Sequence, residues 1–171
     1  RYATAGYRGL LAPSGDEAQL HAVGANGTLF GIVDAYMWAM AGVEWGMYRP
    51  LPPGSPEGTE QKPVTSHAAL DLWKKPNKHY SRQLFVKTVT QHLELVGTGY
   101  AVVVKLGGLP VELWPVMPHR ITPVPHPQEF IAGYVYTSPD GEQVPLGTDV
   151  VIRVVQTPCP WDPYRGMGAV Q

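Results

Sequence analysis

The stretch that decides the fold is residues 81–104, SRQLFVKTVTQHLELVGTGYAVVV. Its first half carries apolar residues at steps of three and four, a spacing that places them on one face of a helix. Ser81 can cap the start of this helix, and Gly97 suits the left-handed conformation that commonly ends one. After Gly97 the pattern changes to aromatic and β-branched residues, which favour a strand. The sequence therefore predicts a helix that leads directly into a β-sheet.

Downstream of this stretch, short strand-like runs alternate with turn residues. Gly107 and Gly108 form a turn dipeptide between the runs 100–106 and 111–114, so the two runs predict a β-hairpin. Four further strands are expected at residues 120–124, 133–137, 142–146 and 150–155, with a tight turn at 139–141. Because helices precede a run of strands, the predicted class is α+β, with N-terminal helices followed by a mainly antiparallel β-sheet.

Upstream, residues 28–48 predict a long amphipathic helix. Apolar residues recur at steps of four and three, and Asn26 or Thr28 can cap the first exposed N–H groups. The members of this stripe that we expect at a subunit contact are Leu29, Val33, Tyr36 and Met40. Most of the helix circumference is apolar, so it needs cover on more than one side, from its own domain or from other subunits.

The chain divides into four parts on this pattern. Residues 1–27 lack a sustained period and predict an extended N-terminal arm, which residues 28–49 follow as the amphipathic helix. Residues 50–63, PLPPGSPEGTEQKP, predict a surface linker because they hold few apolar side chains. Residues 64–171 form the α+β domain, in which Ser66 is expected to cap a short helix that runs through Trp73.

Composition narrows the classes of function. The 171 residues are 44% hydrophobic and carry a formal net charge of -1, which excludes the strongly basic footprint of a non-specific nucleic-acid binder. The single cysteine, Cys159, cannot form a disulfide within the chain, which fits a reducing compartment. Asp34 and Glu44 interrupt the longest apolar stretch, so no membrane association is expected.

No residue pattern predicts catalysis, a cofactor or a metal. Gly97-Thr98-Gly99 follows a helix, whereas a phosphate-binding turn precedes one. His67 and Asp71 are too few to form a metal site, and His92 lies on the apolar stripe of its helix, where packing is the expected role. A Ser/His/Asp site assembled in space stays open, because sequence does not show spatial adjacency.

Two segments are candidates for contacts with partners. The only local basic cluster lies between the two central helices and consists of Lys74, Lys75, Lys78 and Arg82. These side chains could contact nucleic acid. Alternatively they are solvent-exposed, and Lys74 and Lys75 stabilise the negatively polarised C-terminal end of the preceding helix. The aromatic and charged segment at 161–166 follows the last strand, and its candidate subunit contacts are Trp161, Tyr164 and Arg165.

The order of motifs resembles the portal protein family of tailed phages and prophages. After the helix at 28–48 come LDLWKKPN (70–77), the stretch 81–104, PVELWPVMPHRITPV (110–124), GYVYTSPDGEQVPLGTDVVIRV (133–154) and DPYRGMGAV (162–170). Together these segments cover about four fifths of the chain. Thr98 stands where the family usually has asparagine, and the linker at 50–63 is long for the family.

The resemblance implies a structural protein without catalytic residues or cofactors. Portal proteins form a ring, expected to have twelve subunits, at one capsid vertex; DNA enters through it during packaging and leaves through it during ejection. This chain is similar to the outer wing region, with neighbouring subunits and the major capsid protein as expected partners. Docking to terminase and to the head–tail adaptor would involve segments beyond residue 171. The implied locations are the virion and, during assembly, the host cytoplasm.

Two alternatives from other classes remain at this stage. One is an intracellular α+β binding or adaptor module, which near-neutral charge and the absence of a catalytic motif would also suit. The other is a hydrolase whose Ser, His and Asp side chains converge only in the folded chain.

Overall fold

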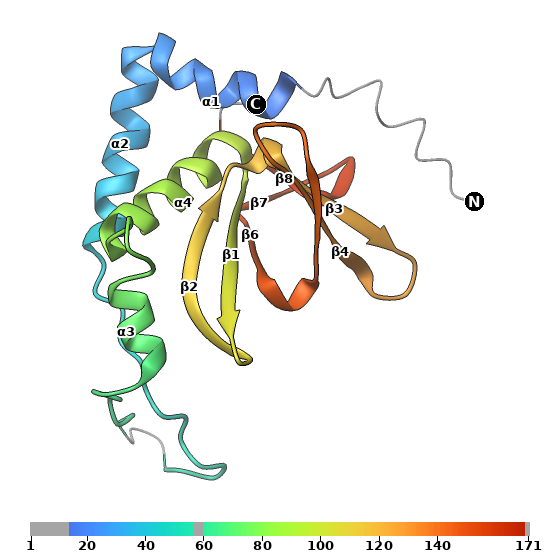
Figure 1. Ribbon diagram of the computed structural model, residues 1–171. Helices are drawn as coiled ribbons and strands as arrows, with labels where there is room; N and C mark the ends of the chain where they lie inside the picture. Colours follow the sequence, from blue (N-terminus) through green and yellow to red (C-terminus); the bar gives the residue numbers. More distant parts are fainter. Residues whose placement is uncertain (1–13, 57–59, 170–171) are drawn as a thin grey trace.

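The computed structural model describes residues 14–56 and 60–169. Helices occupy the N-terminal half and strands the C-terminal half, so the predicted α+β class is confirmed (Figure 1). The helices are α1 (Ser14–Ala25), α2 (Gly27–Gly42), α3 (Ala68–Lys74) and α4 (Arg82–Val96). None of them has the length and apolar content needed to cross a membrane, as far as the described residues extend.

The strands form three small antiparallel sheets where one was expected. The first sheet has the order β2-β1-β6, the second β3-β4-β5, and β7 pairs with β8 alone. Two 3-10 helices, η1 (Pro118–Arg120) and η2 (Thr148–Val150), connect strands of the first two sheets. The strands are β1 (Thr98–Leu106), β2 (Leu109–Val116), β3 (Ile121–His126), β4 (Phe130–Thr137), β5 (Gln143–Leu146), β6 (Val151–Val155), β7 (Thr157–Cys159) and β8 (Asp162–Met167).

Helix α4 and strand β1 match the sequence prediction closely. The Ser81 side chain accepts a hydrogen bond from the Leu84 N–H at 3.2 Å. Gly97 ends the helix in the left-handed region, with φ 77°, and its N–H donates to the Leu93 carbonyl. A side chain at Gly97 would overlap the backbone of Met167, so glycine is required there for two reasons.

The end of β8 closes the junction between α4 and β1. The Gly166 N–H donates to the Thr98 hydroxyl at 2.7 Å, and the Ala169 N–H donates to the Glu94 carbonyl at 2.9 Å. Gly166 and Gly168 lie so close to the α4 terminus that a Cβ at either would collide with its backbone. Residues far apart in sequence therefore complete this helix end.

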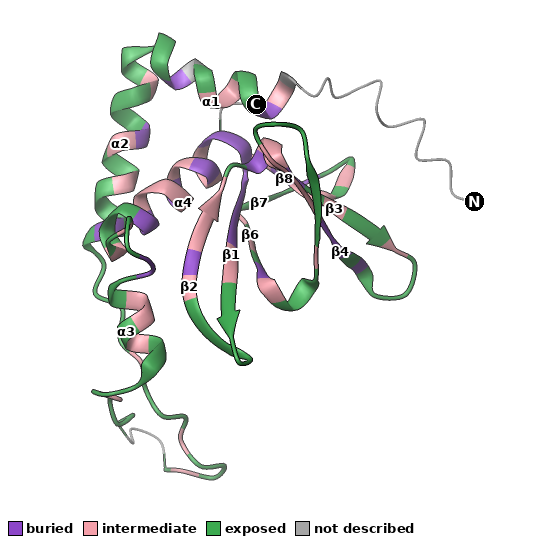
Figure 2. Cartoon of the chain, viewed as in Figure 1, coloured by how far each residue is buried: buried purple, intermediate pink, exposed green. Residues whose placement is uncertain are grey.

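Helix α4 lies between α2 and the first sheet, and most buried residues face it (Figures 1 and 2). One cluster joins Ala41 of α2 to Phe85 and Val86 of α4 and to Ala101 and Leu113 of the sheet. A second cluster links α1 and α2 to the end of α4. A third packs the first two sheets together through Tyr100, Ile121, Ile131, Tyr134 and Val151. Two of the three clusters therefore contain residues of α4, and the third lies between the sheets.

Two of the predicted N-terminal boundaries are wrong. The extended arm expected over 1–27 contains α1 (Ser14–Ala25), while residues 1–13 lie outside the described part. The helix expected over 28–49 ends at Gly42. The Arg49 N–H donates to the Lys62 carbonyl and the Val64 N–H to the Met47 carbonyl, so the chain after Gly42 pairs with the far end of the proline-rich segment. Long-range pairing overrides helix periodicity there.

Three smaller differences concern a cap, a hairpin and strand ends. The Nδ1 atom of His67 caps α3 by accepting from the Ala69 N–H at 3.1 Å, in place of the predicted Ser66. The segment at 161–166, which was placed after the last predicted strand, belongs mostly to a further strand, β8, which pairs with β7. The other predicted strands are present, with ends shifted by a few residues.

Candidate interaction surface

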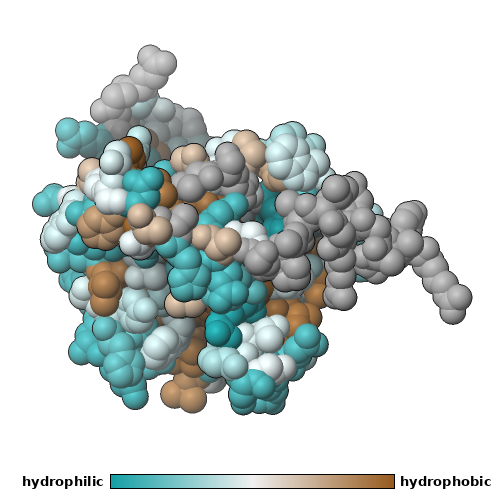
Figure 3. All heavy atoms as spheres, turned by 90° about the horizontal axis from the view of Figure 1, so that it is seen from above, coloured by the Kyte–Doolittle hydropathy of each residue, from teal (hydrophilic) through white to brown (hydrophobic). Residues whose placement is uncertain are grey.

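The outer face of α2 is the largest set of exposed apolar side chains on one element of the described chain. Trp38 is 60% exposed, Tyr36 54% and Ile32 53%. We define the α2 outer face as these residues with the other exposed apolar residues of the helix and the segment after it, namely Phe30, Met40, Val43, Trp45 and Tyr48. Apolar side chains also reach the surface on the α2 side when the molecule is seen from above (Figure 3). Large exposed apolar side chains in this number on one helix favour an interaction site.

The opposite face of α2 belongs to the core of the chain. Val33 and Ala41 are only 3% and 4% exposed, and Leu29 and Met37 pack partly buried beside them. Helix α2 therefore packs on the core through four residues at steps of four, and most of its other residues are exposed. Sequence alone showed an apolar circumference but could not show which side α4 would take.

Of the predicted helix contacts, only two lie on the uncovered side. Tyr36 and Met40 belong to the α2 outer face. Val33 is corrected, because it is buried within its own chain and offers no surface to a partner. Leu29 is likewise half-buried against the cluster at the end of α4.

The predicted contacts after the last strand divide in the same way. Trp161 is 56% exposed. Tyr164 stacks on Phe130, with ring centroids 4.7 Å apart, and Arg165 forms an ion pair with Asp16 of α1. Tyr164 and Arg165 are thus both engaged within the chain and half-buried, and their contact with another subunit stays a prediction.

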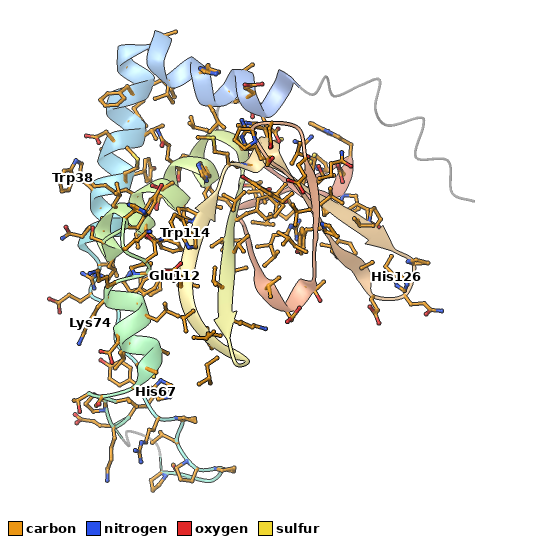
Figure 4. All side chains as sticks on the ribbon, in the orientation of Figure 1. Trp38, His67, Lys74, Glu112, Trp114 and His126 are labelled. Atoms are coloured by element: carbon orange, nitrogen blue, oxygen red, sulfur yellow. The ribbon has the colours of Figure 1, made fainter. Side chains whose placement is uncertain are left out.

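The side chain of Trp38 points away from the body of the molecule at the edge formed by α2 (Figure 4). The ammonium group of Lys87, from α4, lies over the Trp38 ring at 2.8 Å from its centroid. A cation over an indole face is attracted by the ring quadrupole, so this contact holds Trp38 in one orientation. Trp45, in the segment after α2, packs edge-on against Trp73 of α3 with centroids 5.6 Å apart. Contacts within the chain therefore hold both Trp38 and Trp45 in place.

The basic cluster lies on a turn that is fixed to the edge of the first sheet. Lys74, Lys75 and Lys78 are exposed and Arg82 is half-buried, and neither ion pair of the described residues includes them. Lys74 is labelled at the outer edge of the molecule in Figure 4. No local sequence pattern indicated what holds this turn in place.

Asn77 is the residue that fixes the basic turn, and it is only 4% exposed. Its Nδ2 donates to the Leu113 carbonyl at 2.7 Å, while its Oδ1 accepts from the His79 and Tyr80 N–H groups at 2.8 and 2.9 Å. The Leu113 N–H in turn donates to the Pro76 carbonyl at 2.8 Å. The turn therefore covers part of the open edge of β2 and presents the lysines on a rigid support.

A small pocket of about 260 Å³ lies between α1, α4 and the segment around η1. Its lining is Glu17, Leu20, His21, Gln91, His92, Met117 and His119. His92 is 5% exposed, as predicted for a packing residue, but its Nδ1 has no hydrogen-bond partner among the described residues. Burial, with a smaller contribution from His119, lowers the pKa of His92 from 6.5 to about 4.

The pocket does not assemble the alternative hydrolase site. No serine or aspartate is among its lining residues. Across residues 14–56 and 60–169, no group of three or more His, Cys, Asp and Glu side chains could hold a metal ion. His67, proposed with Asp71 as the nearest approach to a ligand pair, instead caps α3 with its ring nitrogen.

A known protein family matches most of this chain. The family model described as phage portal protein matches residues 28–171. A search of the curated proteins finds no match.

Several solved structures share the fold. One is described as the neck of a native GTA particle with C12 symmetry, with a TM-score of 0.72 and 21% identity over 93% of this chain and 40% of that one. Another is the neck of an empty GTA particle with C6 symmetry, with a TM-score of 0.70 and 22% identity over 91% of this chain and 39% of that one. A third is the virion of a native gene transfer agent (GTA) particle, with a TM-score of 0.69, 22% identity, and coverage of 89% and 38%. The chain spans about two fifths of the length of these relatives. With the family model matching residues 28–171, the chain belongs to the phage portal protein family.

Proposed function

We propose that this chain forms the outer part of a portal subunit, a structural component of the ring at a capsid vertex through which DNA is packaged and ejected. Family membership supports the proposal, and the observation that carries it is the α2 outer face. A structural ring subunit must bury apolar surface against its neighbours, and this face is a large apolar surface that the chain itself leaves exposed.

The proposed assembly is a homo-oligomeric ring, with twelve subunits as the expected number. Relatives with the same fold are described with C12 and C6 symmetry, and a closed ring of identical chains needs heterologous contacts between two different surfaces. The proposed partners are neighbouring subunits and the major capsid protein. Terminase and the head–tail adaptor would dock on parts of the protein that this chain does not include.

We propose that the protein acts in the virion and is present in the host cytoplasm during assembly. Double-stranded DNA is the proposed cargo, and the basic turn at Lys74, Lys75, Lys78 and Arg82 is the proposed place for any contact of this chain with phosphate groups. The role is structural, without a catalytic step. An adaptor module is an alternative, and it predicts a monomer or dimer where a portal predicts a ring.

The test is the assembly state of the full-length gene product. Native mass spectrometry and negative-stain electron microscopy should show a ring of about a dozen subunits with a central hole. A full-length protein that stays monomeric or dimeric across micromolar concentrations would contradict the portal proposal and favour the adaptor.

A further inference from the structure

Three histidines from three different elements gather around the pocket between α1, α4 and η1. His21 belongs to α1, His92 to α4 and His119 to η1, and all three line the pocket. His21 is exposed and His119 is half-buried, whereas His92 is only 5% exposed. Histidine ordinarily titrates near pH 6.5, so a group of imidazoles at a junction between elements makes that junction sensitive to pH.

His92 is placed so that it holds a proton poorly. Its Nδ1 has no hydrogen-bond partner among the described residues, and neither has the Nδ1 of His119. Glu17 is the only acidic residue in the pocket lining, and because it is exposed, solvent screens its charge. Asp16, the other acidic residue of α1, is already paired with Arg165 of β8. A charged imidazole at position 92 would therefore lose its hydration without gaining a buried anion, and a charged His119 would repel it.

Helix α1 covers this part of α4. It lies across the end of α4 that leads into β1, and it also contacts η1 (Figure 1). The α1 side of the pocket consists of Glu17, Leu20 and His21. Detachment of α1 would therefore open the pocket and bring water to His92, which removes the cost of charging its imidazole.

Helix α1 is held to the rest of the chain by few contacts. Among its described side chains only Asp16 and Val23 are buried, the first in the pair with Arg165 and the second in the cluster at the end of α4. Leu20 is half-buried in the same cluster. Asn26 alone joins α1 to α2, and it is exposed. An element with few buried contacts opens at a low cost in free energy.

The rest of the core does not depend on α1. The cluster around Phe85 joins α2, α4 and the first sheet, and the cluster around Tyr100 joins the first two sheets. Neither cluster contains a residue of α1. The remainder of the chain therefore keeps most of its packing when α1 detaches.

We propose that α1 is a pH-dependent element, which is docked on α4 and η1 while His92 is uncharged and detaches by rotation at Asn26 when His92 takes up a proton. The docked helix excludes water from an imidazole that has no partner for a charge. The detached helix leaves that imidazole hydrated. This inference concerns contacts within one chain, so it does not rest on the proposed ring.

The docked and detached states bind the proton with different strength. In the docked state the pKa of His92 is about 4, and in the detached state we expect the ordinary value of 6.5. Detachment is therefore favoured as pH falls from 6.5 towards 4, by up to about tenfold per pH unit, and it does not change with pH well above 6.5. Between pH 7 and pH 5 the equilibrium should shift towards the detached state by roughly 20-fold.

Hydrogen exchange of the full-length protein, followed by mass spectrometry from pH 7 to pH 4.5, tests this inference. Labelling times are scaled so that intrinsic exchange is the same at each pH. With only 12 residues, a detached α1 is too short for a stable helix in water, so its amides exchange when it detaches. Peptides from α1 should lose protection by roughly 20-fold between pH 7 and pH 5, while peptides from α4 and β1 keep theirs.

Two variants identify the group that titrates. His92→Leu removes the imidazole and keeps a side chain that suits a buried site, so α1 protection should no longer depend on pH. The matched control is His21→Gln, which removes an exposed imidazole from the same pocket and should leave the loss as it is in the unmodified protein. Acid loss that persists in His92→Leu, or that disappears in His21→Gln, assigns the effect to another group and overturns the inference.

The unmodified protein decides the question even if His92→Leu does not fold. The logarithm of α1 protection should change by at most about one per pH unit, as expected for a single proton. Unchanged protection, or a change of about two per pH unit, overturns the inference. An equal loss in α1, α4 and β1 also overturns it, because the whole chain then unfolds. Absence of α1 protection at pH 7 does so as well, since the helix would not be docked.

Discussion

At the scale of single residues, Asn77 shows how one buried amide can hold a charged turn in place. We expect Asn77→Ala to lower the free energy of unfolding by about 2–3 kcal/mol, since three hydrogen bonds are lost and buried partners are left unsatisfied. Urea denaturation of the chain would measure this. Lys78→Ala, an exposed change next to it, should alter stability by less than about 0.5 kcal/mol.

His92 should make stability depend on pH. Its pKa is lowered in the folded state, so the unfolded chain binds the proton first as pH falls. Its contribution is present above about pH 6.5 and is lost as pH falls towards 4, by roughly 3 kcal/mol in total. Urea denaturation at pH 7 and pH 4.5 should therefore show a smaller loss for His92→Gln than for the unmodified chain. The exposed His21→Gln should behave like the unmodified chain, and equal losses in all three would contradict the prediction.

The basic turn makes a prediction about salt. If it contacts DNA phosphates, Lys74→Ala/Lys75→Ala/Lys78→Ala should weaken binding to duplex DNA and reduce the slope of log affinity against log salt by about 2–3. Fluorescence anisotropy of labelled DNA would measure this with the full-length protein. The control is Lys105→Ala, because Lys105 is already paired with Asp149 at 2.7 Å. An unchanged slope in the triple variant would assign the cluster to a solvated face.

The sequence predicts the roles of residues that interact with close neighbours along the chain. It does not predict the roles of residues whose partners lie far away in the sequence. Ser81 and Gly97 were identified because capping involves residues within one helical turn. Asn77 bonds a strand 36 positions away, and Arg165 pairs with Asp16 across 149 positions, so no local pattern reveals either role. Only two residues of the α2 outer face, Tyr36 and Met40, were predicted as contacts. Periodicity identifies the apolar residues of the helix, but it does not show which side of the helix α4 covers.

At the scale of elements, the junction between α4 and β1 is set by strong local signals, whereas its neighbours are not. Helix α1 has little apolar periodicity and is held by Val23 and the Asp16–Arg165 pair, so an arm was expected in its place. Helix α2 stops at Gly42 because the following residues pair with residues 62–64. Hairpin β7–β8 has strands too short and irregular to show a period of two.

The same junction gives an element-scale prediction. Gly97→Ala should destabilise the chain by more than the 1–2 kcal/mol typical of a positive φ, because its Cβ would also overlap the Met167 backbone. Gly107→Ala is the matched control, since Gly107 has φ 59° but open space around it. Thermal unfolding should show a clearly lower Tm for Gly97→Ala than for Gly107→Ala. Equal shifts would mean that β8 does not press on this junction.

At the scale of the whole molecule, α4 joins the other helices to the first sheet, and the exposed side chains of α2 are the surface that we propose for assembly. The isolated chain should self-associate as its concentration rises, because the α2 outer face is open to solvent. Ile32→Ser/Trp38→Ser should reduce the sedimentation-average mass at high concentration. Val144→Ser, at a residue 38% exposed on β5, is the control and should not. A monomer at all concentrations would show that this face alone does not drive association.

The closing of the α4 end by β8 also sets an order of events during synthesis. The hydrogen bonds from Gly166 to Thr98 and from Ala169 to Glu94 join residues that are far apart within the α+β region. They therefore raise the contact order, which is the mean sequence separation of residues in contact. On the ribosome, α4 and β1 emerge about 70 residues before the segment that seals them. A nascent chain stalled before β8 has left the exit tunnel should therefore be far more sensitive to protease than one stalled after it.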